Sequence, residues 1–561
     1  MNCIAGRACK HQRTDVRQES KQCKVALRPR EAGAVRRGPC WIEALPTELF
    51  DLIFRHVSGT AAMDAVVNHS EQHSQRHSLA CMAALDGERN KAMTQVCRRW
   101  RSQLLASYYQ YAVYNGQTNE LEIPEEHLCY VRRILIHVPD GYRSFRMAAR
   151  TMSWLPPEVR GKIRWLGLAM GEMAAISKSE YGSLAGFFPN LCRLDLDFAQ
   201  VDLSERSICA ALLDSDSSAR ITVLAFHRCG LMGQKLRARL ICRAAKSLEF
   251  LDTGQFDAQL LGNVLWRGSG TPGGVCFPQL RRLYFHVCGK SEQQSESSLV
   301  PKRRQRQLFP RIEEMRCVVA ALGDDEDDGG DVLGLRALVD GILGGLMPEL
   351  RRLSIMFDAA WAMPELSAAA MPGLEHVLLA GKSGEAMRAA LGQALGMATK
   401  SLLRHLCVRV PSIVDVGALS DFGQTSELRT LDLRTWAVSL CGMQQILGNL
   451  PRLRSLALTL TDPYSYPHPD DIGFNLQVRR LWLGAAEEGR AWDALALDSL
   501  LTLVTQMVNL QELLLFKRAL LRLNNAILRD KTGDLCQFAR YVNFGLCSKG
   551  EWTAVKAGFG K

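Results

Sequence analysis

The sequence predicts an α/β fold: a small all-α domain followed by a solenoid with parallel strands on its concave side and helices on its convex side. Three observations predict it: an apolar motif that recurs between residues 131 and 515, helix-like segments between its copies, and a separate helical pattern that begins at residue 41. Of the 561 residues, 47% are hydrophobic and 23% are charged, which is typical of a folded chain.

The first hundred residues contain three different patterns. Residues 1–40 hold ten Lys or Arg against three acids and show no apolar periodicity, so they predict a disordered basic arm. Residues 41–57 and 92–105 each have helical apolar spacing, and Pro46 is tolerated in a first helical turn. They predict a helical domain over 41–115, interrupted by a polar insertion at about 58–80.

The recurring motif has the form apolar-x-x-apolar-x-apolar and is the clearest signal in the chain. Its fourteen first residues span 379 positions (510 − 131), a mean period of about 29. The copies begin at Val131, Ile163, Leu191, Ile221, Leu248, Leu280, Ile312, Leu350, Leu374, Leu403, Leu428, Leu453, Val478 and Leu510. Each copy predicts one short strand.

Helical periodicity fills several of the intervals between copies, at 203–213, 233–245, 333–346, 385–398, 437–447 and 491–507. One strand and one helix cannot bury their own apolar faces, so such units are stable only when they stack. The pattern therefore predicts a solenoid over 126–525 with polar loops at 290–307 and 323–331, and a C-terminal cap or tail over 526–561.

Composition excludes several classes of protein. Lys and Arg number 69 against 58 Asp and Glu, a mild net charge of +11 over a large surface. Eighteen Cys occur without a Cys-x-x-Cys pair, and the opening MNCIAGRACKHQR lacks an apolar signal core, so we expect free thiols and a cytoplasmic or nuclear location. Uncharged stretches are interrupted by polar residues, so we expect no membrane span.

The helical N-terminal pattern resembles the F-box motif, and the repeats resemble leucine-rich repeats of the long type, a usual partner of an F-box. The F-box resemblance implies docking on the Skp-type adaptor of a cullin–RING ubiquitin ligase. The matching positions, which the resemblance implies bind the adaptor, are Leu45, Pro46, Leu49, Ile53, Phe54, Val96, Cys97 and Trp100.

The chain departs from both families. The Val-Cys-x-x-Trp element lies closer to Leu-Pro in F-box proteins, and the Asn or Cys that follows the strand in leucine-rich repeats occurs here as Cys229 and Cys288. The alternative interpretation of the N-terminal helices is a cap that covers the open end of the solenoid core.

Other motifs have weaker interpretations. His69, His73, His77 and Cys81 are each four residues apart and could bind a metal on a helix, but the run around them is polar and predicts a solvated loop. The basic run 301–306 is either a nuclear import signal or a solvated loop, and the acidic run 324–329 lacks the final carboxylate of a calcium loop. Without a catalytic motif at recognisable spacing, we expect neither an enzyme nor a cofactor.

Strand alternation indicates which side chains would meet a partner. The fourth and sixth residues of each motif point into the core, so the third and fifth point to the concave side. The expected target-binding residues are Arg133, Trp165, Arg193, Arg282, Tyr284, Arg352, Arg480 and Trp482. Arg, Trp and Tyr are typical of interfaces, although the Arg residues could instead only solubilise the sheet.

Three functions fit these patterns. The first is the substrate receptor of a ubiquitin ligase, whose target is acidic or phosphorylated because Arg282 and Arg352 lie near the middle of the sheet beside Tyr284. The second is a scaffold of the same fold that acts outside a ligase. Binding of nucleic acid is the third, and the modest net charge makes it the weakest.

Overall fold

The structure is a computed structural model of the chain. It describes residues 109–118, 120–138, 151–170, 187–198, 220–227, 229, 234–267, 277–289, 309–321, 338–339, 341–343, 345–357, 366, 369–381, 387–391, 393–394, 402–409, 414–415, 427–461, 477–485, 494–529 and 541–546. The chain divides into two units, Met1–Val57 and Ser58–Lys561, and all described residues belong to the second.

Within the described residues, eighteen strands form one continuous sheet. They are β1 (Tyr111–Asn115), β2 (Glu120–Leu121), β3 (Arg133–Val138), β4 (Trp165–Met170), β5 (Arg193–Phe198), β6 (Val223–His227), β7 (Phe250–Asp257), β8 (Arg282–Gly289), β9 (Glu314–Ala321), β10 (Arg352–Phe357), β11 (His376–Gly381), β12 (His405–Arg409), β13 (Val414–Asp415), β14 (Thr430–Val438), β15 (Ser455–Leu460), β16 (Arg480–Ala485), β17 (Glu512–Leu515) and β18 (Asn543–Leu546).

Neighbours in the sheet follow the order of the chain. From β3 to β12, each strand pairs in parallel with the next, and β12 continues through β14 to β18 in the same way. At the N-terminal edge, β1 pairs in parallel with β3, and β2 pairs antiparallel with β1. This sequential parallel stack confirms the predicted solenoid.

Every copy of the apolar motif forms a strand, and each strand begins at the third residue of its motif. The reason is a forked backbone hydrogen bond. The carbonyl of the second motif residue accepts from the N–H groups of both the second and third residues of the next copy, as Arg132 O does from Arg164 (2.9 Å) and Trp165 (3.3 Å). The first motif residue, such as Ile163, is buried at this point and fixes the chain against the core.

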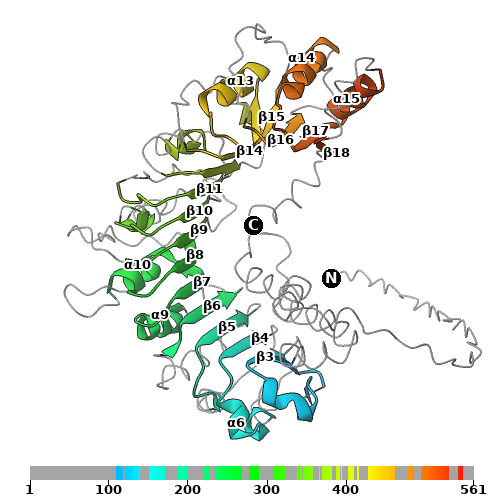
Figure 1. Ribbon diagram of the computed structural model, residues 1–561. Helices are drawn as coiled ribbons and strands as arrows, with labels where there is room; N and C mark the ends of the chain where they lie inside the picture. Colours follow the sequence, from blue (N-terminus) through cyan, green and yellow to red (C-terminus); the bar gives the residue numbers. More distant parts are fainter. Residues whose placement is uncertain are drawn as a thin grey trace, which may run out of the picture. The chain divides into compact units, whose positions relative to one another are not determined.

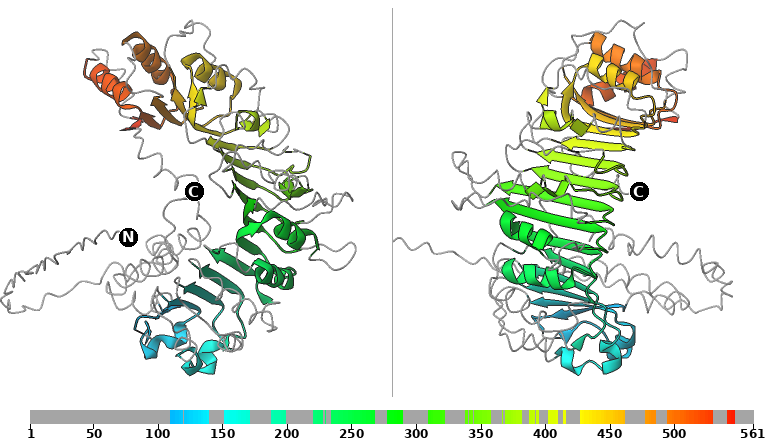
Figure 2. Two further views of the ribbon diagram at one scale, coloured as in Figure 1. Left: turned by 180° about the vertical axis from the view of Figure 1, so that it is seen from behind. Right: turned by 90° about the vertical axis from the view of Figure 1, so that its left-hand side faces the viewer.

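Helices lie on one side of the sheet, the outer side of its curve (Figures 1 and 2). Those described with full bounds are η2 (Glu125–Tyr130), α6 (Pro157–Arg160), α9 (Gln234–Ala244), α10 (Ala258–Arg267), α13 (Leu440–Asn449), α14 (Ala494–Thr505) and α15 (Lys517–Arg529). Their apolar faces and the inward side chains of the strands make one continuous core. The predicted helices 233–245, 437–447 and 491–507 correspond to α9, α13 and α14.

Helix boundaries and the limits of the sheet differ from the prediction in identifiable ways. Ala437 and Val438 belong to β14, because the Ser439 hydroxyl accepts a hydrogen bond from Gly442 N–H (3.0 Å) and starts α13 there. Helices α10 and α15 were not among the helices predicted from the apolar periodicity. Predicted helices 333–346 and 385–398 are described in part, with helical residues at 338–339, 341–343, 387–391 and 393–394, and 203–213 lies outside the described residues.

The sheet is longer than the predicted solenoid at both ends. Strand β1 falls inside the range assigned to the helical domain, because Ala112 and Tyr114 alternate with half-exposed residues and are buried in the core. Strand β18 lies beyond residue 525 and pairs with β17. The basic arm, the insertion at 58–80 and the loops 290–307 and 323–331 lie outside the described residues.

Gly254 allows β7 to bulge. The register between β7 and β8 shifts between Asp252 and Gln255, and Gly254 adopts a φ of 61°, which L side chains rarely adopt. Its N–H donates to Asp252 Oδ1 at 3.0 Å, and a Cβ at this position would lie 2.5 Å from the carbonyl oxygen of Phe226.

We predict that Gly254→Ala destabilises the protein by roughly 1–3 kcal/mol, because it adds backbone strain and a contact with a fixed carbonyl. Urea unfolding followed by circular dichroism measures the change. Gly161→Ala is the control, since Gly161 has φ −65° in an ordinary helical conformation, and we expect it to lose less stability. Equal losses in the two variants would contradict the explanation.

Candidate functional site

The strand register arranges the outward side chains in rows. The third motif residues pair from strand to strand, for example Arg282 with Glu314, Glu314 with Arg352, and Arg352 with His376. We call the side of the sheet opposite the helices the open face, and these residues its first row. The fifth motif residues form a second row and the seventh a third. Burial alternates along β10, β11 and β12 in the predicted sense.

Near its N-terminal end, the open face is tied together by Asp195. This carboxylate is fully buried, accepts a hydrogen bond from Trp165 Nε1 (2.5 Å), and pairs with Arg193 (3.0 Å) on its own strand. The Tyr111 ring lies 5.0 Å from the Trp165 ring. Trp165 is therefore only 7% exposed and offers little ring surface, and its role in target binding stays a prediction.

Glu314 organises the middle of the open face. Its Oε1 accepts from the Tyr284 hydroxyl (2.8 Å) and pairs with Arg316 (3.0 Å), whose guanidinium also lies over the Tyr284 ring at 4.4 Å. Burial, ahead of the neighbouring charges, raises the pKa of Tyr284, so its phenol stays protonated and donates. Tyr284 is only 5% exposed, so little of its ring is available to a partner, and its role in target binding stays a prediction.

Two arginines lie beside this cluster in the first row. The Arg352 side chain is 64% exposed, and its contact with Glu314 is long, at 3.9 Å. Arg282 pairs in register with Glu314 from the other side and is half-buried. Among the described residues, Arg282 has no ion-pair partner.

Two histidines stack next to Arg352. His376 on β11 and His405 on β12 are in register, with ring centroids 4.1 Å apart and planes inclined by 4°. Burial, followed by nearby positive charge, lowers the pKa of each imidazole to about 4; the charges are Arg352 and Arg404 for His376, and Arg429 and Arg404 for His405. Both rings are therefore neutral at physiological pH.

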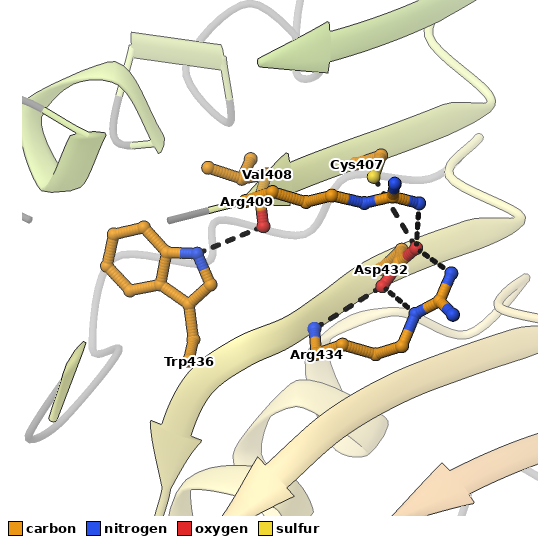
Figure 3. Close-up of polar contacts among 6 residues, drawn as sticks. All are labelled: Cys407, Val408, Arg409, Asp432, Arg434 and Trp436. Atoms are coloured by element: carbon orange, nitrogen blue, oxygen red, sulfur yellow. Dashed lines mark hydrogen bonds and ion pairs between the residues drawn. The ribbon is translucent and has the colours of Figure 1, made fainter. Parts of the chain in front are cut away.

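Asp432 holds a third cluster, toward the C-terminal end of the face (Figure 3). Arg434, two residues along β14, donates to it through Nε (2.8 Å) and through a terminal nitrogen (2.6 Å), and Arg409 from β12 lies 3.2 Å away. Burial opposes ionisation of Asp432, but these hydrogen bonds and charges outweigh burial and hold the pKa of the carboxyl below its usual value.

Two of the remaining predicted residues, Trp482 and Arg480, lie toward the same end of the face, and Arg133 lies near its N-terminal edge. The Arg434 guanidinium packs over the Trp482 ring at 4.8 Å, so the half-buried Trp482 braces the cluster as well as facing outward. Arg480 is 61% exposed and lies 3.7 Å from Glu512. Arg133 is half-buried in the first row.

The chemistry of the face is that of binding. Burial, followed by the charge of Asp432, raises the pKa of the Cys407 thiol to about 12, so this cysteine is a poor nucleophile. In the described part of the chain, no three His, Cys, Asp or Glu residues are arranged to hold a metal ion. The candidate metal ligands His69, His73, His77 and Cys81 and the predicted adaptor-binding residues lie outside the described ranges.

Two further observations concern predicted properties of the chain. The cysteines with described side chains are free thiols: Cys129, Cys192, Cys229, Cys242, Cys288, Cys317 and Cys407. No described helix combines the length and apolar character needed to span a bilayer.

Two residues of the third row, Arg409 and Arg434, neutralise the buried Asp432. Neither was among the residues predicted from the sequence. Strand alternation extended by one more step, from the fifth to the seventh motif residue, identifies both. The sequence pattern does not distinguish among the outward arginines. The structure separates those that pair with a buried carboxylate from those with exposed side chains, such as Arg352 and Arg480.

Comparisons with known proteins give little further information. No protein-family model matches the chain, and no curated protein matches it. Among solved structures, the chain is similar to an internalin from Listeria monocytogenes, with 12% sequence identity and a TM-score of 0.33 over 70% of this chain and 89% of that one. That similarity is too distant to carry an argument, and the fold described above rests on the strand register.

We predict that Asp432→Asn destabilises the solenoid by roughly 3–5 kcal/mol, because it removes the negative charge that pairs with the buried Arg434 at 2.6 Å. The contribution of Asp432 to the stability of the folded state also depends on pH. Since its folded-state pKa lies below the unfolded value of about 3.9, its stabilisation is complete at neutral pH and is lost as the pH falls through that lowered pKa. Urea midpoints of wild type and variant should therefore converge below about pH 4, and a constant difference would contradict the assignment.

The histidine pair gives a second pH prediction. The unfolded pKa of a histidine is about 6.5 and the folded value is about 4, so the unfolded chain takes up protons first and stability falls as the pH drops between these values. We expect the double variant His376→Gln, His405→Gln to lose less stability over this range than wild type. Unfolding midpoints measured at pH 7.5 and pH 4.5 test it, and parallel losses would show that the two rings do not resist protonation.

Proposed function

We propose that the chain is a non-catalytic protein-recognition solenoid that binds a protein partner on the open face of its sheet. The observation that carries this proposal is the strand register, which aligns outward side chains from many repeats into rows. Buried carboxylates hold part of the face rigid, while the side chains of Arg352 and Arg480 are exposed and Arg282 is half-buried. A rigid face with accessible arginines suits the recognition of another protein surface.

We propose further that the chain is the substrate-recognition subunit of an SCF-type ubiquitin ligase. The support is the sequence resemblance of residues 41–57 and 92–105 to an F-box, which would dock on a Skp-type adaptor and so on the cullin ligase core. The solenoid would then hold the target near the transferred ubiquitin and raise its effective concentration there. Such a subunit works in the cytoplasm or nucleus and performs no bond chemistry itself.

The alternative is a scaffold of the same fold that acts outside a ligase, with the N-terminal helices capping the solenoid. Binding of nucleic acid is less well supported. Arg193, Arg316 and Arg434, which would be needed for a continuous positive track, are each neutralised by a carboxylate on the same strand.

The ligase role predicts loss of adaptor binding in the double variant Leu45→Ala, Pro46→Ala and in Trp100→Ala. Removal of these side chains takes away the apolar contacts that the F-box resemblance assigns to the adaptor, and we expect affinity to fall at least a hundredfold. Calorimetry with a purified Skp-type adaptor measures it, and unchanged thermal unfolding of the solenoid shows that the fold is intact.

Deletion of Ser58–Ala80 is the matched control, because an insertion should be dispensable for adaptor binding. Wild-type protein that never associates with a Skp-type adaptor would rule out the ligase role and leave the scaffold. Loss of solenoid stability in the Leu45→Ala, Pro46→Ala variant would instead support the capping role.

A further inference from the structure

We propose that the middle of the open face, at Arg282, Arg352, His376 and His405, binds a phosphoserine or phosphothreonine side chain of the protein partner. The inference rests on the proposed function of the open face and names the chemical group that this face would select. It is carried by the position of these four residues in the first row, by the charges around them, and by the exposure of Arg352.

Arg282, Arg352 and His376 lie near enough in the sheet to meet one phosphoryl group, and His405 stacks on His376 from the next strand. Arg352 is in register with His376, and His376 with His405, while Arg282 is two strands from Arg352 across Glu314. Adjacent strands lie about 4.8 Å apart, so the Cα atoms of Arg282 and Arg352 are separated by roughly 10 Å. Two arginine side chains can converge over such a distance on a group that lies between them.

Glu314 lies between the two arginines but does not repel an anion strongly. One of its oxygens is already bound by the Tyr284 hydroxyl and by Arg316, and its side chain is only 11% exposed. Arg316 compensates the single negative charge of Glu314. The guanidinium groups of Arg282 and Arg352 therefore remain as two positive charges in excess.

This excess matches a phosphomonoester better than a carboxylate. A phosphorylated side chain carries between about −1.5 and −2 charges at neutral pH and three acceptor oxygens, and arginine forks pair with it bidentately. An aspartate or glutamate of the partner brings a single charge. A nucleic-acid strand brings phosphates in series, but the arginines farther along the face are neutralised by Asp195 and Asp432.

His376 completes the site as a neutral donor, and His405 stacks against it. Each neutral imidazole has one N–H group to offer an acceptor oxygen. The charged groups around the rings are Arg352, Arg404 and Arg429, opposed by Glu314 and Glu375. Positive charge therefore predominates around the pair, and a bound dianion would offset it and make protonation of the rings easier.

The test compares two first-row arginines in the full-length protein. Arg352 and Arg480 are similarly exposed and each makes one long contact to a glutamate, at 3.9 and 3.7 Å, but only Arg352 lies beside the histidine pair. Arg352→Gln and Arg480→Gln thus remove the same charge from the same row. The probe is a degenerate peptide pool with a fixed phosphoserine, compared with the same pool carrying serine or glutamate.

We expect wild type to bind the phosphoserine pool at least tenfold more tightly than either other pool. Arg352→Gln should remove that preference, and Arg480→Gln should change it less than twofold. Equal binding of the serine or glutamate pool by wild type, or equal losses in the two variants, would overturn the proposal, and so would tighter binding of single-stranded nucleic acid than of the phosphoserine pool.

Histidine NMR gives a second readout that does not depend on peptide sequence. Saturating inorganic phosphate should raise the pKa values of His376 and His405 above about 4, and Arg352→Gln should weaken that shift. Unchanged pKa values in wild type would contradict phosphate binding at this site.

If the preference for phosphoserine fails while wild type still retains protein partners, only this inference is wrong. If wild type retains no protein partner, the proposed function fails as well.

Discussion

The forked hydrogen bond at the start of each strand is the constraint on which the rest of the structure depends. One carbonyl, at the second motif residue, accepts from two successive N–H groups of the next repeat, and this arrangement recurs from Arg132 O near the N-terminal edge to Arg479 O, which accepts from Gln511 and Glu512. Because each fork fixes where the next strand starts, equivalent residues stay in register even though the intervals between motif copies vary in length. The rows of the open face are a direct consequence.

Strict register places like positions side by side, so the face needs a way to accommodate many charges. It does so with three buried acids, Asp195, Glu314 and Asp432, each paired with an arginine two residues away on the same strand. Strand alternation guarantees that such residues share a face. An aromatic ring packs with each pair, as Trp165, Tyr284 and Trp482 do, and these clusters make the face rigid as well as polar.

Rigidity separates the side chains that maintain the face from those that can meet a partner. Arginines locked to a buried carboxylate have fixed positions and little charge to offer, whereas Arg352 and Arg480 are held loosely and are exposed. Partner recognition by such a face would depend on a few accessible groups on a preorganised surface, which limits the entropy lost on binding. Its centre differs from both ends, because there positive charge exceeds the local acids and two neutral imidazoles lie alongside.

The sequence by itself determined the architecture: the apolar motif located fourteen strands and the alternation of their side chains, because both follow from a two-residue period that each repeat carries locally. It also identified most first-row residues of the candidate site. Only the tertiary structure decided that Trp165 and Tyr284 are buried, that His376 stacks on His405, and which arginines remain accessible. These outcomes depend on which side chains of neighbouring strands meet, and those strands are roughly thirty residues apart in the chain. Because the repeat period varies, the pattern of a single repeat does not show which side chains of the next repeat it will contact.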